Sequence, residues 1–223
     1  MAERLLPVLF DGSIATEEVD PFSAALSELR PEEGLGFAGA PERFLEFRAG
    51  RHCARRALER LGVVAAPVRR APDRSPIWPP GVVGSITHTR RTGFGFCGAA
   101  VARDSRWRSI GLDAEIDDAL DERLFERVLT EVERSRIDRF PAALHGRIAK
   151  IVFSAKESVY KCQHPISGEF LGFLDVEVEL AEGARRFQAT LRRPAGPFAT
   201  GFVFEGRYSS GGGVVATAVT LAR

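Results

Sequence analysis

The 223-residue chain has few lysines, few cysteines and no long apolar run. Its three cysteines, Cys53, Cys97 and Cys162, are odd in number and far apart, so they suggest neither a disulfide framework nor a zinc site. No stretch approaches the roughly 18 apolar residues of a membrane-spanning helix, and the first residues lack the pattern of a signal peptide. We therefore expect a cytoplasmic protein without membrane contact.

The net charge of the whole chain indicates little about its function. The 31 basic and 30 acidic residues nearly cancel, which gives no general argument for binding nucleic acid. The only lysines are Lys150, Lys156 and Lys161, whereas arginine is abundant. A GC-rich genome is one explanation for this bias. The confinement of the lysines to one segment nevertheless indicates a role for Lys156 and Lys161.

The apolar pattern predicts an α+β fold in two halves, residues 1–108 and 109–223, with a ligand cleft between them. We predict helices over 21–30, 41–61 and 142–163, a helical stretch from 121, and a capping box at Thr130–Glu133. Residues 65–81 form a proline-rich connector, and the turn at 103–108 links its flanking strands as a hairpin or meander. The predicted strands cover 5–10, 82–87, 93–101, 109–116, 172–180, 186–193, 198–206 and 214–221.

Two acidic motifs indicate chemistry on a phosphate ester. Asp113 and Glu115 follow a strand-like run, and alternate strand residues share a face, which places these carboxylates roughly 6–7 Å apart. Glu157 and Lys161 lie one helical turn apart. Carboxylates and lysines together suit a hard cation that holds a phosphate. The alternatives are a turn-capping aspartate and a surface ion pair.

Two further groups of residues suit phosphate binding. Gly84–His88 places a glycine, two hydroxyls and His88 at a strand end, although a lone histidine is more often structural. Five basic side chains also lie on an arc of roughly 140° of the helix over 41–61, which is either a phosphate site or a solvated face. They are Arg48, Arg51, His52, Arg55 and Arg56.

Three motifs together resemble those of the 4'-phosphopantetheinyl transferase family: Gly84–His88, Ile110–Glu115 and Phe153–Lys161. The resemblance is to the larger, pseudo-twofold form of the family, which is typified by the enterobactin and surfactin synthetase activators. The actinobacterial branch is the most similar. Flanking matches at 50–55, 73–79 and 170–173 extend the resemblance over roughly 40–180. It implies two α+β halves related by a pseudo-twofold axis and a monomer. It also implies transfer of phosphopantetheine from coenzyme A to a serine of an apo acyl, polyketide or peptidyl carrier protein, with release of adenosine 3',5'-bisphosphate.

The resemblance also implies roles for individual residues. Asp113, Glu115, Glu157 and the Ala114 carbonyl would hold Mg2+, or Mn2+ in its place. Glu157 would also accept the serine proton, and Lys161 would stabilise the pyrophosphate charge. Asp113, Glu157 and Lys161 are thus the expected catalytic residues. The expected coenzyme A contacts are Arg48, Arg56, Arg70, Arg74, Thr87, His88, Lys156 and Lys161, with the phosphate contacts in the first half and the metal and carrier side in the second.

Two other functions remain open on the residues alone. A Mg2+-dependent phosphohydrolase would use the same carboxylates, and a coenzyme A or nucleotide-binding module would need the basic groups only. An acidic carrier protein would suit an arginine-bearing landing surface between the two acidic motifs, although a solvated helix face explains these arginines equally well. They are Arg123, Arg127, Arg134 and Arg136.

Overall fold

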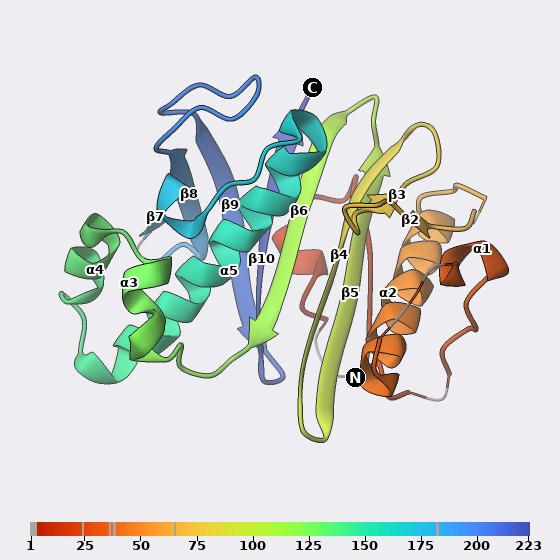
Figure 1. The fold of residues 1–223 in the computed structure, drawn as a ribbon, viewed down its shortest axis with the longest axis horizontal. Coiled ribbons are helices and arrows are strands. Elements are labelled where there is room, and N and C mark those ends of the chain that lie inside the picture. The colour runs from red at the N-terminus through yellow and green to blue at the C-terminus, as the bar shows by residue number, and fades with distance from the viewer. Residues whose placement is uncertain (1–3, 24, 36, 38, 65, 182) are drawn as a thin grey trace.

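The computed structural model describes residues 4–23, 25–35, 37, 39–64, 66–181 and 183–223. Two antiparallel sheets lie side by side, and each is covered by one long helix (Figure 1). The predicted α+β fold with two α+β halves is confirmed. Their pseudo-twofold relation stays a prediction, as does the division of roles at residue 108. In the described chain, no helix combines the length and apolar character needed to cross a membrane.

The first half contains a sheet in the order β1-β5-β4 and the helix α2. Helix α2 begins with Pro41 at its first turn and ends before Gly62, whose φ of 70° only glycine adopts readily. Small buried residues of α2 pack against β5. The elements are η1 (Pro7–Leu9), β1 (Ala15–Val19), α1 (Pro31–Gly34), α2 (Pro41–Arg60), β2 (Arg69–Arg70), β3 (Pro76–Ile77), β4 (Val82–Arg91) and β5 (Phe94–Arg103).

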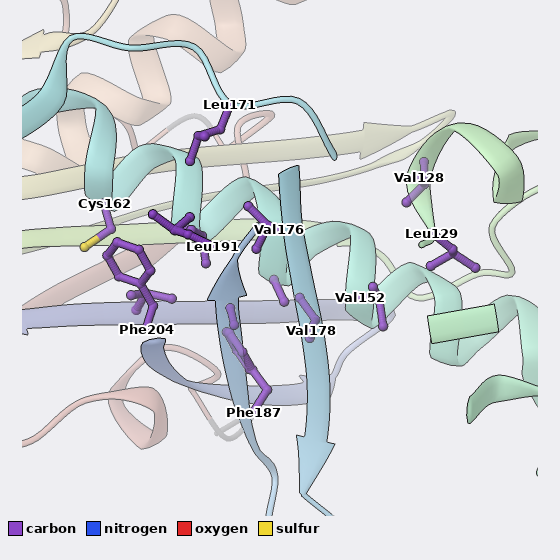
Figure 2. Packing of buried hydrophobic residues seen from close by; sticks show 14 of the residues in the cluster. Val128, Leu129, Val152, Cys162, Leu171, Val176, Val178, Phe187, Leu191 and Phe204 are labelled. Carbon is purple, nitrogen blue, oxygen red and sulfur yellow. The ribbon is translucent and has the colours of Figure 1, made fainter. Parts of the chain in front are cut away.

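The second half contains a sheet in the order β6-β10-β9-β8-β7 and the helix α5. Figure 2 shows α5 residues such as Val152 and Cys162 packed on Val178, Phe187 and Phe204 of this sheet. The elements are β6 (Trp107–Ile116), η2 (Glu122–Leu124), α3 (Phe125–Val128), α4 (Glu131–Ile137), α5 (Ala142–Ser167), η3 (Phe173–Asp175), β7 (Val176–Ala181), β8 (Arg186–Leu191), β9 (Val203–Gly211) and β10 (Val214–Ala222).

The two halves meet where β4 runs beside β6 (Figure 1). The Leu112 amide of β6 donates to the Ser85 hydroxyl of β4 over 3.1 Å. Behind this seam, one apolar cluster takes side chains from both sheets and from residues 5–14, among them Leu6, Ala100 and Ile110. The seam therefore brings the motif at 84–88 beside the motif at 110–115.

Most predicted elements are confirmed, including the capping box, in which the Thr130 amide donates to Glu133 over 2.7 Å. The strand over 5–10 is wrong. Residues 7–9 form the 3-10 helix η1, because Pro7 has no N–H for a ladder and the Leu5 and Leu6 amides donate to the Glu18 carboxylate over 2.7 Å each.

Two other predictions are wrong. Residues 21–23 and 25–30 contain no helix, because the Asp20 carboxylate binds the Phe22 amide and Arg55 binds the Glu28 carbonyl. The prediction also spans residue 24, which lies outside the described residues. Strands β5 and β6 form no hairpin or meander, because the turn between them carries the chain from the first sheet into the second, where β6 pairs with β10.

Candidate active site

The carboxylates predicted from the two acidic motifs lie where β6 faces α5. Asp113 is 4% exposed and is held by two residues of the helix. The Ser154 hydroxyl donates to Asp113 Oδ2 over 2.8 Å, and Lys161 Nζ donates to Asp113 Oδ1 over 2.7 Å. Lys161 Nζ also donates to the Leu112 carbonyl over 3.1 Å. Helix α5 therefore fixes the Asp113 carboxylate with two side chains that lie about two helical turns apart.

A glycine on β6 makes this proximity possible. A Cβ atom at Gly111 would lie 1.8 Å from the Ser158 carbonyl oxygen and 2.8 Å from the Cys162 amide nitrogen. The Ser158 hydroxyl donates to the Thr217 carbonyl of β10 over 2.9 Å, which fastens the same turn of the helix to the sheet. Since the backbones touch here, Glu157 lies close to Asp113.

The electrostatics of this group favour a cation. Burial and the Asp113 charge raise the pKa of Glu115 to about 7, and the same two causes raise the pKa of Glu157. Lys150 and Lys161 partly oppose the shift at Glu115. Three carboxylates with a deficit of nearby positive charge are the hard oxygen donors that Mg2+ or Mn2+ prefers. The residues therefore fit a divalent cation, although in the described chain no three acidic, histidine or cysteine side chains already converge on one point.

A cation-lined cavity of about 390 Å³ opens between α2, β2 and β4. Arg51 is its most buried cation, at 5% exposure, and its guanidinium stacks 4.4 Å from the centre of the Phe47 ring. Arg51 Nε and Nη2 have no hydrogen-bond partner among the described residues, and burial lowers its pKa to about 10. Arg70, Arg74 and His88 also line the cavity. Buried donors without acceptors favour an anionic ligand.

His88 joins this cavity to the carboxylates. Arg43 Nη1 lies 2.9 Å from His88 Nε2, and Glu46 Oε1 lies 3.7 Å from His88 Nδ1. Burial, and after it the Arg43 charge, lower the pKa of His88 to about 4, and Lys161 adds to this shift, whereas the Glu46 and Asp113 charges partly oppose it. His88 is therefore a neutral imidazole at pH 7.

Thr87 lies on the opposite face of β4 from His88, since strand side chains alternate. Its hydroxyl is buried and has no hydrogen-bond partner in the described part of the chain.

A second cavity, of about 320 Å³, lies between the halves and is lined by Ser85, Tyr160 and Lys161 among others. Arg74 lines both cavities, at a turn where its φ is 73°. The side chains of His164 on α5 and Asp73 beside Arg74 lie 3.8 Å apart. The two cavities therefore extend from Lys161, past Arg74, to Arg51, which agrees with the expected cleft between the halves.

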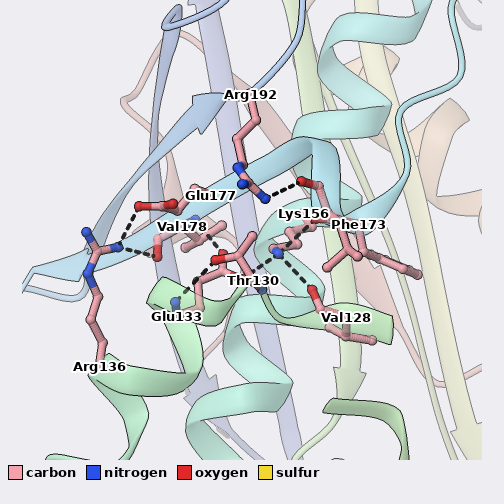
Figure 3. A network of polar contacts seen from close by, with 10 residues as sticks. Val128, Thr130, Glu133, Arg136, Lys156, Phe173, Glu177, Val178 and Arg192 are labelled. Carbon is pink, nitrogen blue, oxygen red and sulfur yellow. Dashed lines mark hydrogen bonds and ion pairs between the residues drawn. The ribbon is translucent and has the colours of Figure 1, made fainter. Parts of the chain in front are cut away.

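Some predicted residues lie elsewhere. Arg48 and Arg56 are not among the residues that line either cavity; they form ion pairs with Glu28 and Glu59. Lys156 is buried against Glu133 on another face of α5 (Figure 3), and its coenzyme A contact stays a prediction. Ala114 lies in the β6–β10 ladder opposite Ala216.

The sequence pattern places Arg51 on the basic arc of the helix but does not distinguish it from the other four basic residues there. Gly50 beside it was a usable signal, because a glycine inside a helix is unfavourable unless another element packs closely there. A Cβ atom on Gly50 would lie 3.0 Å from Ile86 of β4.

Comparisons with known proteins agree with this architecture. A family profile for the 4'-phosphopantetheinyl transferase N-terminal domain matches residues 35–102, and one for the 4'-phosphopantetheinyl transferase superfamily matches residues 109–218. The 4'-phosphopantetheinyl transferase Svp of Streptomyces mobaraensis is 40% identical over 204 residues, which cover 88% of this chain and 80% of the relative.

Two further relatives match over almost their whole length. The 4'-phosphopantetheinyl transferase PptT of Mycobacterium tuberculosis is 34% identical over 230 residues, or 99% of this chain and 98% of the relative. The 4'-phosphopantetheinyl transferase Npt of Nocardia iowensis is 32% identical over 232 residues, and both chains are fully covered. The chain therefore belongs to the 4'-phosphopantetheinyl transferase family and is a 4'-phosphopantetheinyl transferase enzyme.

Proposed function

We propose that the chain transfers the 4'-phosphopantetheine group at the seam between β4, β6 and α5. Coenzyme A is the donor, and the serine of an apo carrier protein is the acceptor. The observation that carries the proposal is the position of Lys161. Its ammonium contacts the Asp113 carboxylate and also lines the cavity between the halves. One residue thus joins the carboxylate group to the space in which a pyrophosphate would lie.

Asp113, Glu115 and Glu157 would hold Mg2+ or Mn2+, with the Ala114 carbonyl as a further oxygen ligand. When bound, the cation supplies positive charge to the pyrophosphate and to the phosphorus under attack. Lys161 has three N–H donors, of which two reach Asp113 and Leu112. The third donor is left for a phosphate oxygen, where it stabilises the charge on the adenosine 3',5'-bisphosphate leaving group.

Glu157 is the candidate base. Burial and Asp113 raise its pKa, which makes its carboxylate a better acceptor for the proton of the attacking serine. Its half-buried position beside Asp113 also excludes part of the water that would compete with the serine. We rank this role below its contribution to cation binding, because one carboxylate does not serve both roles fully in the same step.

The other phosphate of coenzyme A would occupy the cation-lined cavity. Arg51, Arg70, Arg74 and His88 surround it, and the orphaned donors of Arg51 are its strongest anion-seeking atoms. Arg48, Arg56 and Thr87 stay predicted contacts that require their side chains to turn toward the ligand.

An acidic carrier protein would dock beside α5. Arg127 and Arg123 are exposed, although Arg123 pairs with Asp121. Arg134 pairs with Glu126, and Arg136 pairs with Glu177 and Glu179, so Arg127 is the arginine of this set best placed to attract the partner.

Enterobactin synthase component D of Salmonella typhimurium, 36% identical over 132 residues, makes peptidyl carriers of siderophore assembly one class to test. The buried free thiols suit the reducing cytoplasm, and action as a monomer stays a prediction.

Intact mass spectrometry of apo carriers incubated with coenzyme A and Mg2+ tests the proposal. Transfer adds roughly 340 Da, the mass of the phosphopantetheine group. Glu157→Gln should abolish the gain, whereas Glu205→Gln, at an exposed carboxylate on β9, should retain it. Full activity of Glu157→Gln would refute the assignment. Release of adenosine 3',5'-bisphosphate without a carrier would instead identify a hydrolase, and coenzyme A binding without turnover a binding module.

A further inference from the structure

The Lys156 ammonium is enclosed by acceptors from three elements (Figure 3). Nζ lies 2.6 Å from Glu133 Oε2, 2.7 Å from the Val128 carbonyl and 2.9 Å from the Phe173 carbonyl. Both charged side chains are 1% exposed. Since an ammonium has three N–H donors, these contacts leave none for a phosphate.

Glu133 completes the network. Its Oε2 also accepts the Thr130 amide over 2.7 Å, and its Oε1 accepts the Val178 amide over 2.6 Å. The carboxylate therefore binds the start of α4, the start of β7 and α5 at once. Every polar group of the pair is satisfied, which is the condition under which a buried network is rigid.

The carbonyls that Lys156 binds belong to two neighbouring elements. Val128 ends α3 and Phe173 begins η3, and these elements contact each other. The Phe173 ring also packs 5.2 Å from the Phe153 ring of α5. On the outside, residues 124–128 and 170–174 form what we call the α3–η3 edge. It exposes Leu124, Arg127, Phe170 and Leu174, with Phe170 at 73%.

Lys156 and Glu157 are consecutive on α5, so their side chains point roughly 100° apart around the helix. One points to the α3–η3 edge, and the other lies near Asp113. The helix therefore links the position of the edge to that of the candidate base.

We propose that Lys156 is a positioning residue that holds the α3–η3 edge against α5, so that a carrier protein docked on the edge presents its serine at Glu157. The inference rests on the proposed function. It replaces the predicted phosphate contact of Lys156 with a role in carrier recognition. The mixed surface of Arg127 with three apolar side chains suits an acidic amphipathic helix.

Lys156→Met tests the proposal, because it removes the ammonium and keeps an unbranched chain. The carrier KM should rise at least roughly tenfold from the displaced edge. The coenzyme A Kd, measured by calorimetry, should stay within about twofold, since all three donors of the Lys156 ammonium already bind protein acceptors. Arg147→Met is the matched control, because it removes a cation of α5 that pairs at the surface with Asp117. It should leave both quantities unchanged.

A second variant separates the displacement of the α3–η3 edge from the loss of thermal stability. Lys156→Met leaves the Glu133 carboxylate buried without a cation, and adding Glu133→Gln removes that charge while keeping an acceptor for a backbone amide. The double variant should recover most of the lost Tm, but only part of the carrier KM, because the Val128 and Phe173 carbonyls stay without the ammonium. If Lys156→Met does not fold, Glu133→Gln alone serves the same comparison.

Two results would overturn the proposal. A large loss of coenzyme A affinity, with Tm and carrier KM unchanged, would make Lys156 a phosphate ligand. A lower Tm with both constants unchanged would limit the pair to stability. Absence of transfer by the unmodified protein would instead refute the proposed function. The calorimetric and thermal measurements do not depend on turnover and would still report whether Lys156 contacts coenzyme A.

Discussion

The Gly111 α-carbon and the Ser158 carbonyl lie in direct backbone contact, because a Cβ atom at Gly111 would come within 1.8 Å of that oxygen. Contacts this close leave no room for any side chain. The distance between β6 and α5, and with it the separation of Asp113 from Glu157, is therefore set by one residue without a side chain.

Gly111→Ala should displace α5 from β6 and separate the carboxylates. We expect transfer to fall by at least roughly 100-fold, since small misplacements in an active site have large effects on rate. The free energy of unfolding should fall by about 1–3 kcal/mol or more, as for an overpacked core. Intact mass spectrometry and thermal unfolding measure the two effects. Gly12→Ala is the control, because no atom lies within 4 Å of a Cβ there. Near-normal transfer by Gly111→Ala would contradict the role given to this contact.

Arg51→Met should weaken coenzyme A binding without destabilising the free protein. Loss of a hydrogen bond from a charged group should raise the Kd by roughly 10- to 100-fold. The Tm without ligand should hold or increase, because two buried donors without a described partner disappear. Calorimetry with coenzyme A and with its 3'-dephospho form identifies the phosphate involved. Arg69→Met, at an exposed arginine of β2, should bind normally. An unchanged Kd for Arg51→Met would remove Arg51 from the site.

Acid should destabilise the free enzyme through His88. Its pKa in the folded protein is about 4, below the roughly 6.5 of an unfolded histidine, so only the unfolded chain gains the proton between these values. The contribution of neutral His88 to the free energy of unfolding is fully present above pH 6.5. It falls toward pH 4, by about 1–2 kcal/mol after discounting for solvent screening. His88→Gln should flatten denaturant-derived stability in this window and leave it similar at pH 8. An unchanged slope would show that His88 does not carry this linkage.

The three thiols should be unreactive in the folded protein. All are buried, and burial raises the pKa of each, to about 12 for Cys162. The thiolate is the reactive form, so a thiol reagent at pH 8 should label none of them without denaturant and all three in it. Fast labelling of any one in the native state would contradict the described packing.

The sequence predicted the long helices and most strands well, because each shows its own period and end signals. Helix α2 has Pro41 at its start and Gly62 after its end, and α5 stops at Gly168 in the left-handed conformation. The strand predicted over 5–10 is wrong because this segment has no such signals. A continuous apolar run shows burial but not its partner, and here the Glu18 carboxylate takes the amides that a strand would have paired.

The site was harder to predict in detail, because helical spacing gives an arc but not the neighbour that faces it. Arg48 and Arg51 lie on the same basic arc, yet only Arg51 lines the cation-lined cavity. Lys156 lies in a functional motif, but its partner Glu133 is 23 residues away in the chain. Neither assignment follows from local pattern, because both depend on which element packs on which face.

The apolar cluster behind the seam takes Ala100 from one sheet, Ala216 from the other and Leu6 from the segment before β1. Each sheet is therefore one wall of an interior that belongs to both. A chain cut at the turn between β5 and β6 would leave two pieces with uncovered apolar faces, so heat should melt the whole molecule in one cooperative step. The boundary near residue 108 marks where the chain crosses from one sheet to the other. Because both halves would unfold in the same step, binding of coenzyme A and binding of the carrier protein would be lost at the same temperature.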